Sequence, residues 1–170
     1  MYEHHGGCHC RNARWTLRSE FSALQLPARA CQCDFCRKHA ALTTSDSAGE
    51  MCFVVQDPEA VARYSFATKT ADFLICGRCG VYVGARMADG GKCYAIANLR
   101  TLDGHDVSAY TPEPVDYSGE SSSVRRARRA LRWTPVEVPG VASSTVSVFG
   151  LWRGDRACGP GWVRRITQDL

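Results

Sequence analysis

Residues 30–39 read ACQCDFCRKH and place three cysteines within six residues, in the spacing C-x-C-x-x-C. Catalytic zinc keeps three protein ligands and leaves one position for water or substrate, whereas structural zinc takes four. We therefore expect Cys31, Cys33 and Cys36 to bind one zinc ion as an open site and to form the catalytic centre. The alternative is a closed structural site completed by a more distant ligand such as Cys52 or His39.

Two cysteine pairs flank this stretch, CHC at residues 8–10 and CGRCG at residues 76–80. A C-x-x-C-G sequence is typical of a metal-binding turn whose backbone N–H groups point at the sulfurs. Residues 8 and 10 share one face if that segment is extended. The four thiols of Cys8, Cys10, Cys76 and Cys79 therefore predict a closed structural zinc site. A redox-active C-x-x-C pair, with free thiols at residues 8 and 10, is the alternative.

The other candidate ligands have simpler interpretations. We expect His9 and His39 to be neighbours of the metals rather than ligands, because the thiols already suffice. Cys52 and Cys93 lie in apolar segments and are expected in the core. Cys158 lies near the end of the chain, where we expect an exposed thiol.

The composition favours a globular protein in a reducing compartment. The chain has 170 residues, of which 45% are hydrophobic and 22% are charged, which indicates one domain and a tail. It contains no apolar run of about 18 residues, and residues 1–7 lack the basic and apolar regions of a secretory signal. We therefore expect a cytoplasmic protein with no membrane partner. Because disulfides are rare there, ten cysteines indicate metal binding or catalysis.

The segments between the cysteines predict short strands and frequent turns, and so a mainly β, sandwich-like domain over residues 1–117. We expect a Gly-Gly turn running into the first cysteine pair over residues 6–10, and a helical turn over residues 35–39 capped by Asp34. Residues 43–47 are polar, and residues 45–49 predict a turn. A hairpin turn is expected at residues 89–91. The expected strands cover residues 13–18, 28–32, 51–55, 60–66, 72–75, 81–86 and 92–97.

Residues 118–170 differ in character from the rest. Residues 1–117 carry 12 Lys and Arg against 13 Asp and Glu, whereas residues 118–170 carry 9 against 4. An Arg-rich helix is expected over residues 121–133, followed by an irregular, disordered tail over residues 134–170. Since the basic excess lies outside the domain and such a run is usually a solvated helix face, we do not expect a nucleic-acid partner.

Four segments together resemble the glutathione-dependent formaldehyde-activating enzyme family, which includes centromere protein V. They are GGCHC at residues 6–10, CQCDFCRK at 31–38, FLICGRCG at 73–80 and YAIANLRTLDG at 94–104. The resemblance covers about residues 6–117. It implies a zinc-stabilised β fold of the Mss4-like type, with a structural zinc on Cys8, Cys10, Cys76 and Cys79 and a second zinc on Cys31, Cys33 and Cys36.

The resemblance also implies carbon–sulfur lyase chemistry, in which glutathione and formaldehyde combine to S-hydroxymethylglutathione. The expected partners are thus a small thiol and a small aldehyde, with the thiol held as its thiolate by the second zinc. Arg37 and Lys38 are candidates for holding an anionic substrate. Two other functions stay open: a non-catalytic zinc module that binds protein or nucleic acid, and a metal or redox buffer.

Overall fold

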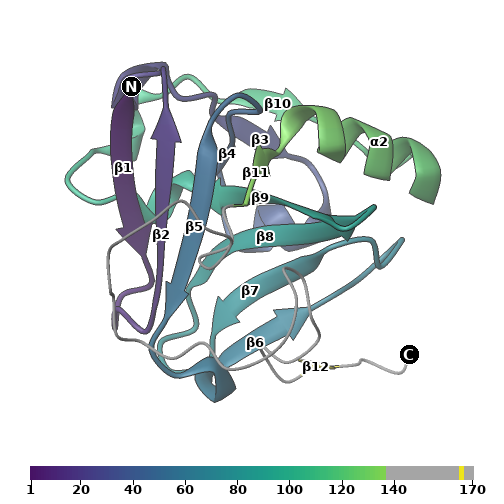
Figure 1. The fold of residues 1–170 in the computed structure, drawn as a ribbon, viewed down its shortest axis with the longest axis horizontal. Coiled ribbons are helices and arrows are strands. Elements are labelled where there is room, and N and C mark those ends of the chain that lie inside the picture. Colours follow the sequence, from purple (N-terminus) through teal and green to yellow (C-terminus); the bar gives the residue numbers. More distant parts are fainter. Residues whose placement is uncertain (137–164, 167–170) are drawn as a thin grey trace.

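A computed structural model describes residues 1–136 and 165–166 of the chain (Figure 1). The described part is mainly β, as the sequence predicts, with two α-helices and four short 3-10 turns. The strands are β1 (Tyr2–Gly7), β2 (Ala13–Ser19), β3 (Arg29–Cys31), β4 (Thr43–Thr44), β5 (Glu50–Val55), β6 (Val61–Tyr64), β7 (Asp72–Cys76), β8 (Tyr82–Asp89), β9 (Lys92–Asn98), β10 (Glu113–Val115), β11 (Thr134–Pro135) and β12 (Arg165–Ile166). The helices are α1 (Asp34–Lys38) and α2 (Ser122–Arg132), and the 3-10 turns are Ala23–Gln25, Pro58–Ala60, Leu99–Thr101 and Val107–Ala109.

The strands form a small sheet and a large sheet that share one hydrophobic core. The small sheet is antiparallel in the order β1-β2-β5. Along β2 the side chains alternate, with Trp15 and Leu17 buried and Arg14 exposed, as the alternating sequence predicts. Figure 1 shows this sheet beside the large one, and the core takes buried residues from both. Its largest fully buried members are Trp15, Leu17, Met51, Leu99, Val61 and Val83.

The large sheet runs in the order β10-β3-β4-β9-β8-β7-β6-β12, and β11 also pairs with β9. Its centre is the antiparallel hairpin of β8 and β9, which turns at Gly90 and Gly91 as predicted. Both glycines have positive φ, at 56° and 78°, as the favoured two-residue hairpin turns require. This arrangement brings β3, β7 and β9, which lie far apart in the sequence, into one surface.

The N-terminal segment differs from its prediction. Gly6 and Gly7 do not form a turn but the end of β1, which pairs along its length with β2. The turn comes later, at residues 8–12, where the amide of Arg11 donates to the carbonyl of Cys8 at 3.0 Å. Cys8 and Cys10 therefore do not share the face of an extended segment. A turn places them together instead.

Local hydrogen bonds organise α1 and the polar segment that follows it. Cys33, not Asp34, is the N-cap residue of α1, so Asp34 is the first residue of the helix itself. In the polar segment after α1 the expected turn forms, since the amide of Gly49 donates to the carbonyl of Asp46 at 3.1 Å, while Thr44 and Asp46 are buried. The Asp46 carboxylate accepts from the Ser19 hydroxyl at 2.7 Å, which satisfies a polar group inside the protein.

The C-terminal helix forms where expected, but the chain continues to pack beyond it. Trp133 is buried, Thr134 pairs with Ala95 of β9, and the amide of Val136 donates to the carbonyl of Cys93 at 3.0 Å. The expected irregular tail is thus wrong for residues 134–136. The remainder of that expectation falls outside the described residues, apart from β12. Within the described residues, no helix has the length and apolarity needed to cross a membrane.

Gly84 lies where β8 of the large sheet comes close to β5 of the small sheet. A Cβ at this position of β8 would collide with the carbonyl oxygen of Ile96 and lie 3.2 Å from the Phe53 ring of β5. We expect Gly84→Ala to lower the free energy of unfolding by about 1–3 kcal/mol, the usual effect of overpacking. Gly119→Ala is the matched control, because nothing lies within 4 Å of its Cβ position. Equal urea midpoints for the two variants would contradict this packing.

Candidate metal centres

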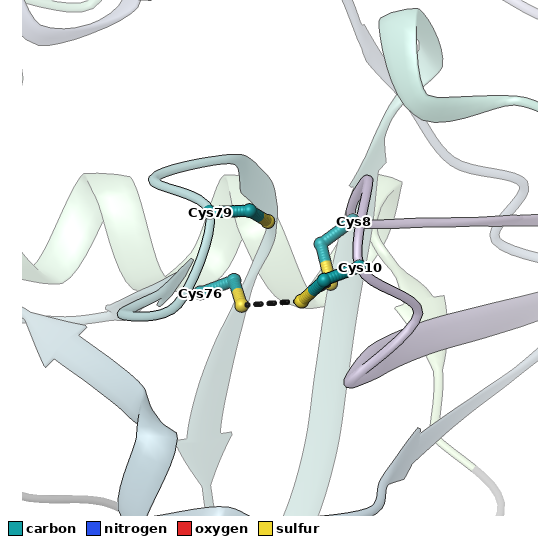
Figure 2. Close-up of side chains that lie close together, drawn as sticks. All are labelled: Cys8, Cys10, Cys76 and Cys79. Carbon is teal, nitrogen blue, oxygen red and sulfur yellow. Dashed lines mark hydrogen bonds between the residues drawn. The ribbon is translucent and has the colours of Figure 1, made fainter.

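Four cysteines from two turns meet at one end of the core, as predicted. Cys8 and Cys10 lie in the turn between β1 and β2, and Cys76 and Cys79 lie at the end of β7 and in the turn that follows (Figure 2). Their ligand atoms all lie within 4.8 Å of one another. The sulfur of Cys10 is 3.6 Å from that of Cys8 and 3.5 Å from that of Cys76. Four sulfurs bound to one zinc at 2.3 Å would be about 3.8 Å apart, so the spacing suits zinc.

The backbone around this first group is arranged for thiolates. In the turn after β7, the amide of Gly80 donates to the carbonyl of Cys76 at 2.8 Å, and Gly80 has the positive φ of 73° that such a turn needs. Burial raises the pKa of Cys79, but amides of Cys10 and Val81 and the neighbouring sulfurs outweigh it and lower that pKa to about 6. The amide of Ala13 likewise donates to the sulfur of Cys8 at 3.2 Å. The backbone thus favours a negative sulfur at Cys79, whereas burial raises the pKa of Cys8 and raises that of Cys76 to about 12.

The second group consists of Cys31, Cys33 and Cys36, whose ligand atoms also lie within 4.8 Å of one another. Cys31 ends β3, Cys33 caps α1, and Cys36 lies inside that helix, so one strand-to-helix turn gathers all three. Hydrogen bonds with the sulfurs of Cys31 and Cys36 lower the pKa of Cys33 to about 2, whereas hydrogen bonds with the sulfurs of Cys31 and Cys33 raise the pKa of Cys36. Three sulfurs so close together cannot all be negative without a cation among them.

No fourth protein ligand joins the second group within the described part of the chain. Cys52 lies on β5 of the small sheet, and the His39 ring packs against Phe35 with a centroid distance of 4.4 Å. Neither residue belongs to a group of potential metal ligands, and the same holds for His9, which is exposed. Residues 1–136 therefore offer three ligands here and four at the first group.

A cavity of about 280 Å³ opens beside the second group, and all three of its cysteines contribute to the lining. The apolar wall includes Phe66, Phe73 and Trp133. None of the four cysteines of the first group lines this cavity. The volume is close to the lower end of the range for small-molecule sites, so the cavity suits a small ligand rather than a chain segment.

The same cavity is lined by five arginines, which the sequence did not connect with the cysteines. Arg37 and Lys38, the expected anion-binding residues, are exposed and do not line it. The arginines that do are Arg29 of β3 and Arg125, Arg128, Arg129 and Arg132 of α2. Within the described residues, no Asp or Glu contributes to the lining. The spacing of the four α2 arginines is the signal that could have revealed them, because positions i, i+3, i+4 and i+7 share one helix face.

Tyr82 is a second residue that the sequence did not single out. Its side chain is 2% exposed and packs edge-on against Phe35, and its hydroxyl has no hydrogen-bond partner in the described structure. Burial raises its pKa well above the ordinary value, and the nearby sulfurs of Cys36, Cys31 and Cys33 add to this. The phenol therefore stays protonated beside the second group.

Comparison with known proteins assigns this chain neither a family nor a function. No protein-family model and no curated protein matches this chain. Among solved structures, the chain is similar to a Rhodobacter sphaeroides protein from a structural genomics programme, with 25% sequence identity and a TM-score of 0.49. The match covers 65% of this chain and 97% of the Rhodobacter chain.

The two groups should differ in their effect on stability. Cys10 is exposed, so Cys10→Ser removes a candidate metal ligand with little loss of packing. We expect it to lower the free energy of unfolding by at least about 3 kcal/mol, since a structural zinc contributes roughly 10–16 kcal/mol to the folding of small zinc domains. Cys33→Ser removes a ligand from one local turn and should have less than half that effect. Chemical denaturation under reducing conditions measures both, and equal losses would contradict the assignment.

Proposed function

We propose that this chain is a zinc-dependent enzyme of the glutathione-dependent formaldehyde-activating type, which forms or cleaves a carbon–sulfur bond between a small thiol and a small aldehyde. In this proposal Cys8, Cys10, Cys76 and Cys79 bind a structural zinc, and Cys31, Cys33 and Cys36 bind a second zinc. One observation carries the proposal: the group with three thiols faces a cavity, whereas the group with four does not line it.

The number of ligands separates the two sites chemically. Four thiolates complete a tetrahedral zinc site and leave no position for a substrate. Three thiolates leave one position, and it is the cavity that a small molecule would enter to reach it. Zinc bound there would supply a Lewis acid that holds a substrate thiol as its nucleophilic thiolate at neutral pH.

The residues of the chain would position the reactants and limit access of water. Phe66, Phe73 and Trp133 give the cavity an apolar wall beside the cysteines. In the addition direction, the thiolate sulfur bonds to the aldehyde carbon, and the carbonyl electrons move to the oxygen, which takes up one proton. In the reverse direction, the hydroxyl loses that proton as the carbon–sulfur bond breaks. Both directions conserve charge and need no oxidant.

Zinc content tests the two sites directly. Protein purified under reducing conditions should contain two zinc ions per chain, and the folded Cys31→Ser/Cys33→Ser variant should contain one, because only the second group loses its ligands. Circular dichroism confirms folding of the variant. One zinc in both proteins would contradict the second site.

Cobalt substitution then tests whether the second site is open. Cobalt absorbs in the visible range, and a fourth sulfur ligand changes its spectrum. Added glutathione should change the spectrum of the cobalt-loaded protein and leave that of the Cys31→Ser/Cys33→Ser variant unchanged. With glutathione and formaldehyde, the zinc protein should accelerate adduct exchange above the spontaneous rate. A spectral response without acceleration would support a non-catalytic thiol-binding zinc module instead.

A further inference from the structure

Helix α2 packs with its charged face inward. Arg129 is 8% exposed, and Arg125 and Arg128 are half-buried, whereas the apolar Val124 and Leu131 are 54% and 76% exposed. A surface helix ordinarily buries its apolar residues and exposes its charged ones. The reversed orientation places guanidinium groups over the cavity of the second cysteine group. Packing of apolar surface cannot explain this arrangement.

The positive charge around the cavity is only partly balanced. Glu120 binds Arg128 through two hydrogen bonds of 2.6 and 2.8 Å and lies 3.5 Å from Nε of Arg125. Glu113 of β10 pairs in register with Arg29 and interacts with its charge, so two carboxylates stand against the five lining arginines within the described residues. A zinc ion with three thiolates would add one further negative charge. Two of the five positive charges then remain without an acidic partner among the described residues.

The guanidinium group of Arg129 has one N–H donor without a hydrogen-bond partner in the described structure. One of its terminal nitrogens donates to the Thr70 hydroxyl at 2.7 Å, and its guanidinium lies 4.7 Å from the centre of the Trp133 ring. Its Nε is buried and has no hydrogen-bond partner in the described structure. Burial, followed by the charges of Arg128 and Arg125, lowers its pKa to about 10, so it stays positive at neutral pH. A buried donor on a charged group is costly unless a ligand satisfies it.

We infer that the arginine face of α2 is an anion-binding roof that restricts the cavity to small ligands carrying at least two acidic groups, such as carboxylates. The inference rests on the proposed function, because it assigns the sulfur of the ligand to the open position of the second site. Arg129, Arg125 and Arg29 then bind the acidic groups. Guanidinium binds carboxylate and phosphate in the same two-point geometry, so a phosphate would share this chemistry.

Three compounds separate the contributions of charge and sulfur in calorimetric titrations of the zinc-loaded full-length protein. Mercaptosuccinate carries one thiol and two carboxylates, its dimethyl ester keeps the thiol without the charges, and succinate keeps the charges without the thiol. We expect mercaptosuccinate to bind at least tenfold more tightly than its dimethyl ester. Succinate should bind more weakly than mercaptosuccinate, but still measurably.

Two variants test whether arginines of α2 cause the difference in affinity between mercaptosuccinate and its dimethyl ester. Arg129→Gln and the less buried Arg125→Gln should each weaken mercaptosuccinate and succinate binding at least tenfold and leave binding of the dimethyl ester unchanged. Arg126→Gln is the matched control, because Arg126 is on the same helix but outside the cavity, where it contacts Ala88 and Asp89. Zinc content and circular dichroism verify that each variant is folded and loaded.

The outcomes distinguish this inference from the proposed function. Equal binding of mercaptosuccinate and its dimethyl ester would overturn the anion-binding roof and leave the thiol site intact. Arginine-dependent binding of succinate, without any adduct exchange by the enzyme, would support the roof and count against the proposed reaction. Equal losses in Arg126→Gln and Arg129→Gln, or no binding of any of the three compounds, would overturn the inference.

Discussion

The structure depends on the meeting of two distant turns through their cysteines. Cys10 follows the first strand and Cys76 ends the seventh, yet their sulfurs are 3.5 Å apart. Unpaired thiols gain little from such contact and four thiolates would repel one another, so a bound cation would stabilise the arrangement. Binding of that cation would fix the small sheet against the large one.

Much of the fold and of both ligand sets could be predicted from the sequence, for local reasons. The alternation of β2 and the two glycines between β8 and β9 determine their structures through near neighbours alone. The spacing C-x-C-x-x-C likewise gathers its three sulfurs within one strand-to-helix turn. The sequence predicts an extended segment at Cys8–Cys10, where the structure has a turn. This turn includes Arg11 with a positive φ, a conformation that is uncommon for residues other than glycine and hard to predict from sequence.

The cavity could not be predicted, because it depends on contacts between segments far apart in the chain. Arg29 and Arg129 are 100 positions apart, and a run of arginines on a short helix is ordinarily a solvated surface. Here the end of the helix is fixed by Trp133 and Thr134, which pack on the large sheet and bring the charged face over the cysteines. The domain with its site thus extends past residue 117, the boundary expected from composition.

Zinc X-ray absorption spectroscopy of the full-length protein tests the central claim most directly, because it counts sulfur ligands. One site with four thiolates and one with three predict a mean of between three and four sulfurs per zinc, with a lighter ligand completing the second site. Saturating thiol should raise the mean to four. Four sulfurs per zinc before any thiol is added would show that both sites are closed, and would contradict the account of an open second site.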